Sequence, residues 1–185
     1  MASTQSSSAT DTRPVFHGPI SPNAQQEIID FSHFVMNKGA FARSTGSSLV
    51  LREVGVFRRE RDGKDHARVV YETTVHGEML NIGNNLHGGC AVYMIDICSS
   101  MALAVLGIAT GKPWNFVSQA LNTTFHAPVP AGVKIEVINT TVSFGSRTVS
   151  AITEIWDVTN HRLCVTGVHN KMKPSDPKPK AEAKL

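Results

Sequence analysis

The feature that most constrains this chain is a run of mostly apolar residues, 90–109, that carries a single charged side chain, Asp96. A run of this length is long enough to cross a membrane as a helix. The acid near its middle, its Gly, Ser and Thr residues and the lack of basic clusters at its ends disfavour that interpretation. We therefore predict a helix that is apolar on all sides because it is buried in the core of a soluble domain.

The segment before this run is a polar loop that leads into two glycines. It begins at Asn81 and ends with His87-Gly88-Gly89, so that the glycines open the predicted helix. The first N–H groups of a helix have no partners within it and lie at the positive end of its dipole, so they can bind a developing oxyanion. A carboxylate in an apolar helix is costly unless it has partners or a task. Gly88 and Asp96 together indicate an enzyme that polarises a carbonyl at the glycines and attacks it with the help of the acid.

The remaining patterns predict one helix and two strands before the long helix, and four strands after it. Ser21-Pro22 is typical of an N-cap and a first helical position, and an apolar stripe follows as far as Gly39. An antiparallel sheet wrapped around one apolar helix would bury both the helix and one face of the strands, so the expected fold class is α+β. The predicted strands are 48–57, 68–75, 116–125, 133–144, 148–157 and 163–172.

Composition sets the limits of the predicted domain, which spans 21–172. Residues 1–20 are rich in Ser, Thr and Pro and are expected to be disordered, and 173–185 form a Lys- and Pro-rich tail that is expected to be flexible. Hydrophobic residues make up 41% of the chain and charged residues 18%, as in ordinary soluble proteins. The net charge of +3 is that of 171–185 alone, where five lysines face two acids, so the folded part is close to neutral and nothing favours nucleic acid as a partner.

The cysteines and histidines do not indicate a disulfide framework or a metal centre. Three cysteines are an odd count, which fits a reducing compartment. His87 and Cys90 are three residues apart, a spacing that can hold a metal, but no second pair with ligand spacing accompanies them. The sequence also lacks a Gly-x-Ser-x-Gly motif and a Gly-rich phosphate loop. We expect no metal and no redox cofactor.

A charged segment, 58–66, separates the first two predicted strands, and its Asp62-Gly63 pair is a hairpin signal. Such a charge run is most often the solvated tip of a hairpin. The alternative is a basic patch that binds a phosphorylated ligand.

These residues resemble a known family, the hotdog-fold acyl-CoA thioesterases. The resemblance rests on Asn81, His87-Gly88-Gly89, Asp96 and Val117-Ser118 in this order, with Ala127-Pro128 after the next strand, and it spans about 48–172. It is strongest to the branch of the phenylacetate-pathway thioesterases and the small mitochondrial acyl-CoA thioesterases of animals. The long charged hairpin and the extended termini depart from the pattern, which leaves the acyl-chain preference open.

The resemblance implies hydrolysis of fatty or aryl acyl-CoA to free acid and CoA, with CoA as part of the substrate. Matched position by position, the Gly88 N–H would polarise the thioester carbonyl, and Asn81 would fix the thioester or the water. Asp96 would act as general base or nucleophile, and Ser118 would orient the attacking water. His87 would support the loop.

Three of these residues also have a purely structural interpretation. Asn81 could brace the loop, and His87 could be a hydrogen-bonded structural histidine. Ser118 could simply bond to a neighbour on its strand. Arg147, after the predicted turn at Gly145, is a candidate for gripping CoA. The other histidines, His126, His161 and His169 among them, are expected to be surface or core residues.

Two other functions remain open on the same fold. An enoyl-CoA hydratase would be expected to pair an Asp and a His about five residues apart, whereas His87 and Asp96 are separated by the glycines. A binding module that senses acyl-CoA without turnover should lack the carboxylate. A panel of acyl-CoAs with a thiol reagent separates the three.

The spacing of Gly88 and Asp96 predicts an active site shared by two subunits. Eight residues of straight helix rise by about 12 Å, whereas reacting groups must lie about 3–3.5 Å apart. Two antiparallel helices would bring each helix start near the middle of the other, which a two-fold dimer achieves. The family resemblance implies the same arrangement, usually with dimers paired into tetramers.

The last three residues, Ala183-Lys184-Leu185, resemble the peroxisomal Ser-Lys-Leu signal, so the expected location is the peroxisome. The alternatives are the cytoplasm and the mitochondrion.

Overall fold

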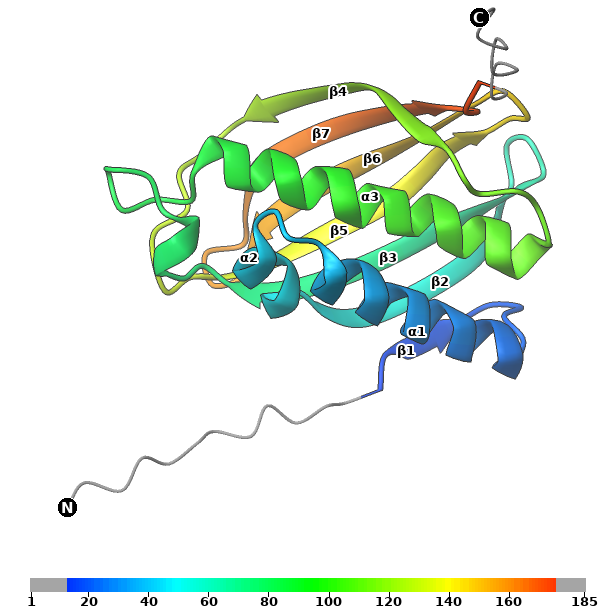
Figure 1. Cartoon of the computed structure of the whole chain (residues 1–185), viewed down its shortest axis with the longest axis horizontal. Helices are drawn as coiled ribbons and strands as arrows, with labels where there is room; N and C mark the ends of the chain where they lie inside the picture. The colour runs from blue at the N-terminus through cyan, green and yellow to red at the C-terminus, as the bar shows by residue number, and fades with distance from the viewer. Residues whose placement is uncertain (1–12, 176–185) are drawn as a thin grey trace, which may run out of the picture.

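One seven-stranded sheet curves around the long helix α3 (Figure 1). The computed structural model describes residues 13–175. The strand order is β1-β2-β3-β5-β6-β7-β4, and every neighbouring pair is antiparallel except β1 and β2, which are parallel. The elements are β1 (Val15–His17), α1 (Pro22–Lys38), α2 (Arg43–Ser48), β2 (Val50–Arg59), β3 (Lys64–Thr74), the short 3₁₀ helix η1 (Gly77–Met79), α3 (Gly88–Thr110), β4 (Val117–Phe125), β5 (Lys134–Phe144), β6 (Thr148–Asp157) and β7 (Arg162–Met172).

Helix α3 is the centre of the core, as its composition predicts. Its start is fixed by His87, whose side chain accepts a hydrogen bond from the Gly89 N–H, and its end by Gly111, whose φ of 66° is readily adopted by glycine. By length and composition it would pass as a membrane span, but 67% of its most apolar window is buried inside the domain. The predicted core helix and the α+β fold class are confirmed.

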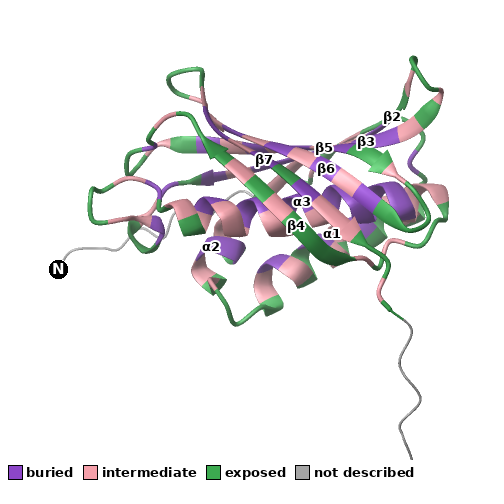
Figure 2. Ribbon diagram, turned by 90° about the horizontal axis from the view of Figure 1, so that it is seen from above, coloured by how far each residue is buried: buried purple, intermediate pink, exposed green. Residues whose placement is uncertain are grey.

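The sheet packs closely against α3, because successive residues of its strands point alternately toward the helix and away from it. In β5 and β6 every second residue is buried, as the period of a strand with one packed face requires (Figure 2). The closest approach is at Gly167 of β7, where an added Cβ would lie 2.7 Å from Cγ2 of Ile95. Glycine is therefore required for β7 to pass this near to the helix.

The N-terminal helix forms as predicted and packs against α3 (Figure 2). Its N-cap is Ser21, which accepts from the Ala24 N–H, and Pro22 is its first residue. It buries Ile28 and Met36. The next helix, α2, is not predicted, because Arg-Ser-Thr-Gly-Ser-Ser has little helix propensity. Tertiary contacts stabilise it, since Gly46 lies against the backbone of Met36.

The predicted disordered tail is too long. Residues 15–17 form β1, which pairs with β2 at the edge of the sheet, and Ile20 is buried. A strand of three residues is too short to show a periodic pattern, so it could not be recognised within the Ser-, Thr- and Pro-rich segment 1–20. Residues 1–12 and 176–185, with most of the predicted C-terminal tail and the tripeptide Ala183-Lys184-Leu185, lie outside the described residues.

The strands after α3 agree with the predicted ranges to within one residue, but the first hairpin is tighter than expected. Strand β2 continues to Arg59 and β3 begins at Lys64, so only 60–63 form the turn. Most of the charged segment is therefore paired strand, and Gly63 takes the left-handed conformation with φ of 61°.

Candidate functional site

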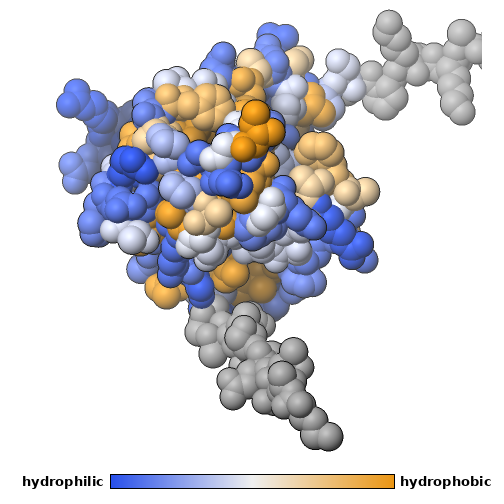
Figure 3. Space-filling model, turned by 90° about the vertical axis from the view of Figure 1, so that its left-hand side faces the viewer, coloured by the Kyte–Doolittle hydropathy of each residue, from blue (hydrophilic) through white to orange (hydrophobic). Residues whose placement is uncertain are grey.

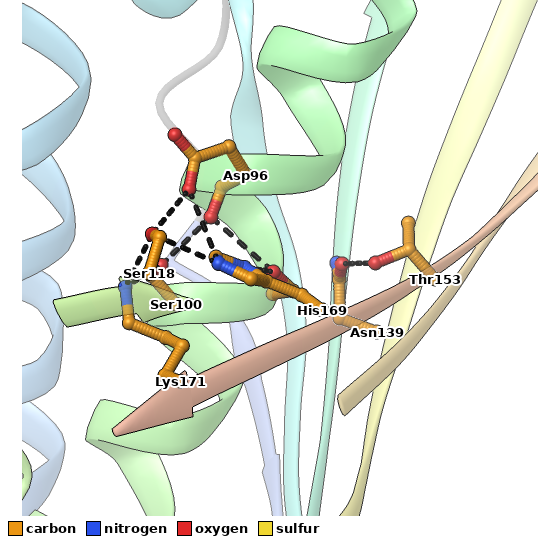
Figure 4. Close-up of polar contacts among 8 residues, drawn as sticks. Asp96, Ser100, Ser118, Asn139, Thr153, His169 and Lys171 are labelled. Atoms are coloured by element: carbon orange, nitrogen blue, oxygen red, sulfur yellow. Dashed lines mark hydrogen bonds and ion pairs between the residues drawn. The ribbon is translucent and has the colours of Figure 1, made fainter. Parts of the chain in front are cut away.

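Asp96, about a third of the way along α3, contacts side chains of two strands, β4 and β7 (Figure 4). Its Oδ1 lies 3.4 Å from Oγ of Ser118 on β4 and 3.6 Å from Nε2 of His169 on β7. Ser118 Oγ is also 2.9 Å from His169 Nε2 and 3.5 Å from Nζ of Lys171. The Asp96 side chain is 48% exposed on the single chain, so it is not the buried acid that an apolar helix suggests.

The hydrogen bonds behind Asp96 determine where the protons lie. The hydroxyls of Ser99 and Ser100 both donate to the backbone carbonyl of Asp96. Ser99 Oγ is then left to accept from His169 Nδ1, 2.7 Å away, so neutral His169 carries its proton on Nδ1. Its Nε2 then has a free lone pair. The Ser118 hydroxyl has one proton and two acceptors, Nε2 at 2.9 Å and Asp96 Oδ1 at 3.4 Å, and the shorter contact favours donation to His169.

The environment keeps His169 in this neutral form. Its side chain is fully buried, and burial together with the Lys171 ammonium lowers its pKa to about 4, although Asp96 opposes this shift. Burial also lowers the pKa of Lys171, again against the effect of Asp96. Lys171 donates to Ser100 Oγ at 2.8 Å.

A second group of predicted residues lies around the start of α3, in a pocket of about 450 Å³. The Gly88 N–H has no acceptor among residues 13–175. A Cβ at Gly88 would lie 3.3 Å from Cζ of Phe125, so glycine keeps the backbone accessible beside that ring. The pocket is lined by Asn81, Asn85, Gly88, Phe125, His126 and Pro128, among others.

Two of the predicted residues hold the loop in front of this pocket. The side-chain oxygen of Asn81 accepts from the N–H groups of Gly83 and Asn85, which braces the turn. His87 Nδ1 accepts from the Gly89 N–H and caps the helix. The contacts on a single chain thus match the structural interpretations of both residues, and Asn81 additionally lines the pocket. Figure 3 views the molecule from this end, where hydrophobic side chains are exposed among hydrophilic ones.

The structure keeps the two groups apart on one chain. Asp96 and Ser118 do not line the pocket at Gly88. The Asp96 cluster instead borders a small apolar pocket of about 190 Å³, which Ser100 and Lys171 line together with Phe31, Trp114 and Phe116. Each chain therefore carries two separate halves of the predicted site.

Sequence reasoning missed His169 and Lys171. His169 is a buried core residue, but it also contacts both Ser118 and Ser99 beside Asp96. The two residues share one face of β7, and β4 pairs with β7 so that Ser118 is opposite Lys171. The two-residue spacing of His169 and Lys171 was visible in the sequence. The pairing of β4 with β7, which brings both residues close to Ser118, was not.

The remaining predicted residue, Arg147, lies in the turn between β5 and β6 and does not line the pocket at Gly88. Its carbonyl accepts from the Lys173 N–H. Among residues 13–175, no group of three His, Cys, Asp or Glu side chains could hold a metal ion.

Comparisons with known proteins bear on the family and the fold. A model of the thioesterase superfamily matches residues 83–164, which include Gly88, Asp96 and Ser118 but not Asn81, His169 or Lys171. No curated protein sequence matches the chain. Zebra fish thioesterase superfamily member 2 superposes with a TM-score of 0.65 at 20% identity, covering 78% of this chain and 94% of its own.

Two bacterial structures are also similar. The PaaI protein of the Escherichia coli phenylacetic acid degradation operon has a TM-score of 0.59 at 19% identity, covering 81% of this chain and 95% of its own. A hypothetical thioesterase of Streptococcus pneumoniae, solved with coenzyme A, has a TM-score of 0.52 at 19% identity, covering 57% of this chain and 77% of its own.

The sheet curved around α3 and the similarity to these structures define a hotdog fold. The predicted resemblance to the thioesterases is confirmed by the family match over residues 83–164.

Proposed function

We propose that the protein hydrolyses acyl-CoA thioesters of fatty or aryl acids to the free acid and CoA. The thioesterase superfamily match supports a thioester hydrolase, and the similar streptococcal protein binds coenzyme A. The observation that carries the proposal is the pair of complementary half-sites. One offers a free backbone N–H at a helix start, and the other offers a carboxylate beside a hydroxyl.

The Gly88 half would polarise the thioester. Its N–H points from the positive end of the α3 dipole and stabilises the negative charge that develops on the carbonyl oxygen. Removing one such donor typically costs about 2.7–4 kcal/mol of transition-state stabilisation. Asn81 braces the loop that presents this N–H and lines the same pocket, so it can contact the thioester or the water.

The Asp96 half would activate water. Because Ser118 gives its own proton to His169, its oxygen is free to accept a hydrogen bond from a water. A water between Ser118 Oγ and Asp96 Oδ1 donates one hydrogen to each and directs its lone pair outward. Asp96 then takes the proton as the oxygen attacks the carbonyl, which is the role of a general base. His169 acts as a positioning residue, and the reaction uses no metal or redox cofactor.

The two halves would meet across a two-fold dimer, with the partner subunit's Asp96 facing Gly88. Strand β4 is an edge strand, and its apolar residues Val117 and Phe125 are 46% and 55% exposed on the single chain. Exposed apolar side chains on an unpaired edge are typical of an interface. Phe125 also lines the Gly88 pocket, so an interface along β4 would adjoin the site. We expect dimers that pair into tetramers.

A hydratase is the second candidate, because the structure does place a histidine beside the acid. His169 Nε2 is 3.6 Å from Asp96 Oδ1. A hydratase would add water to an enoyl-CoA without releasing the thiol, so the two reactions have different products.

The test is a panel of saturated, aryl and enoyl acyl-CoAs incubated with the protein and a thiol reagent. We expect thiol release from saturated or aryl substrates, and Asp96→Asn should lower kcat by about 10²–10⁴-fold. Asp30→Asn removes an exposed acid of α1 and is the matched control, with unchanged turnover. Loss of the enoyl group without thiol release would favour the hydratase, and near-normal turnover by Asp96→Asn would exclude the proposed mechanism.

A further inference from the structure

The charged hairpin of β2 and β3 encloses a second pocket at the other end of the molecule. Figure 1 shows this hairpin, the β5–β6 turn and the C-terminal end of α3 at the same end, opposite the start of α3. Arg59 of the hairpin donates a hydrogen bond to the carbonyl of Val142 near the end of β5, which joins the hairpin to the strand before that turn. The pocket has a volume of about 410 Å³ and shares no lining residue with the pocket at Gly88. Its lining includes His66, three cations and two acids: Arg59, Lys64, Lys112, Asp62 and Asp65.

His66 brings an unsatisfied polar atom to this pocket. The residue is only 2% exposed. Its Nδ1 lies 2.7 Å from the carbonyl oxygen of Thr141, and since a carbonyl only accepts, Nδ1 carries a proton. The buried Nε2 has no partner among residues 13–175. A buried polar atom without a partner is costly and indicates a missing partner, here one with an O–H or N–H when the ring is neutral.

The cations of the pocket are only partly neutralised. Arg59 forms an ion pair with Asp62. Asp65 also lines the pocket and forms no ion pair within residues 13–175, so three cations face two acids there. Lys64 and Lys112 have no ion-pair partner within residues 13–175. Two ammonium groups without an ion-pair partner in the described residues therefore line the same pocket as His66, whose Nε2 has no partner there.

We propose that this pocket binds a phosphate monoester. Anionic phosphate oxygens would pair with Lys64 and Lys112, and a protonated phosphate oxygen would donate to Nε2 of neutral His66, whose proton is on Nδ1. Nε2 would then gain the hydrogen bond that it lacks.

The phosphate has two potential sources, and the binding itself does not depend on the proposed hydrolysis. It is either part of the CoA substrate of another subunit in the assembly, or part of a separate phosphorylated metabolite. In both cases the site requires the same charges and the same hydrogen bond.

Calorimetric titration with inorganic phosphate, and then with AMP, tests the proposal on the full chain. Lys64→Ala/Lys112→Ala should weaken binding of both probes by about tenfold or more. The matched control is Lys38→Ala/Lys134→Ala, which removes the same charge outside the pocket and should bind as the wild type does. Wild-type protein that binds neither probe at millimolar concentration, or equal losses in both double variants, would overturn the site.

The role of His66 is read from the wild type, because replacing this buried residue could unfold the hairpin. The ring C–H resonances of His66 should shift when phosphate is added, and unmoved resonances under saturating phosphate would disprove the contact. The source of the phosphate is identified from the KM and kcat of acyl-CoA hydrolysis. A raised KM for acyl-CoA in Lys64→Ala/Lys112→Ala, with kcat retained, assigns the phosphate to CoA. Unchanged KM with lost AMP binding assigns it to a separate ligand.

Discussion

At the scale of single residues, the proposed role of Asp96 depends on a histidine that must stay neutral. His169 occupies the space between Ser99 and Ser118 and makes a hydrogen bond on each ring nitrogen. If it were protonated on both nitrogens, Nε2 would donate to Ser118 and turn the Ser118 hydroxyl proton toward Asp96. The attacking water would then lose one of its two acceptors. Burial of His169 is thus what keeps Ser118 available as an acceptor.

This burial predicts a specific dependence of stability on pH. The pKa of His169 is about 4 in the folded protein, against 6.5 for the ordinary group. Since the unfolded chain takes up the proton first, the stabilisation is complete above pH 6.5 and is lost as the pH falls toward 4. The loss should be on the order of 3 kcal/mol. Urea unfolding at a series of pH values measures it, and His169→Asn should flatten the curve in this window. A variant with the same slope as the wild type would show that other groups cause the loss.

At the scale of elements, the site depends on how closely β7 approaches α3. Gly167 lies against Ile95, and Ile95 precedes Asp96 on the helix. Two residues after Gly167, His169 contacts Ser118 and Ser99. A strand that stood farther from the helix would separate His169 from these serines. The glycine is therefore a structural requirement of the Asp96 cluster.

A double-mutant cycle tests this close approach. Gly167→Ala should destabilise the fold by about 1–3 kcal/mol, because the new Cβ would lie 2.7 Å from Ile95 Cγ2 in a packed core. Ile95→Ala removes the atoms that collide, so the double variant should be more stable than the sum of the single changes predicts. Chemical denaturation of all four proteins gives the coupling. Simple additivity would mean that the strand shifts freely and that the glycine is not required.

At the scale of the whole molecule, the functional features lie in three places along α3. The Gly88 pocket is at its start, the Asp96 cluster lies about a third of the way along it, and the charged pocket is at its end, where Lys112 follows the helix. A single chain cannot bring the first two together, because α3 is one continuous helix of 23 residues. In the proposed mechanism a second copy of the chain would complete the site, and catalysis would then be a property of the assembly.

Mixed dimers test the shared site. Asn81→Ala and Asp96→Ala should each be inactive alone, since every site contains one defect. When the two are co-expressed, one site of each mixed dimer carries both defects and the other carries none, so part of the activity should return. Differently tagged subunits, purified on both tags in turn, show that mixed dimers have formed. If such dimers remain as inactive as their parents, both halves of a site belong to one chain.

The features that depend on local pattern could be predicted from the sequence. The apolar run with one acid predicted α3, the alternation of apolar residues predicted six of the seven strands, and Ser21-Pro22 marked the start of α1. The His87-Gly88-Gly89 motif located the helix start that defines one half-site. These features are readable because hydrophobic period and capping chemistry act within a few residues of one another.

The contacts that come from long-range pairings could be learned only from the folded chain. The β4–β7 register places His169 and Lys171 beside Ser118, and the buried Nε2 of His66 has no partner among residues 13–175. The structure also shows Asp96 half exposed rather than buried. None of these contacts has a local signature, because two residues separated by fifty or more positions become neighbours only when the sheet has formed. The catalytic roles of Asn81, Gly88, Asp96 and Ser118 stay predictions, since in the proposed site those roles depend on a second copy of the chain.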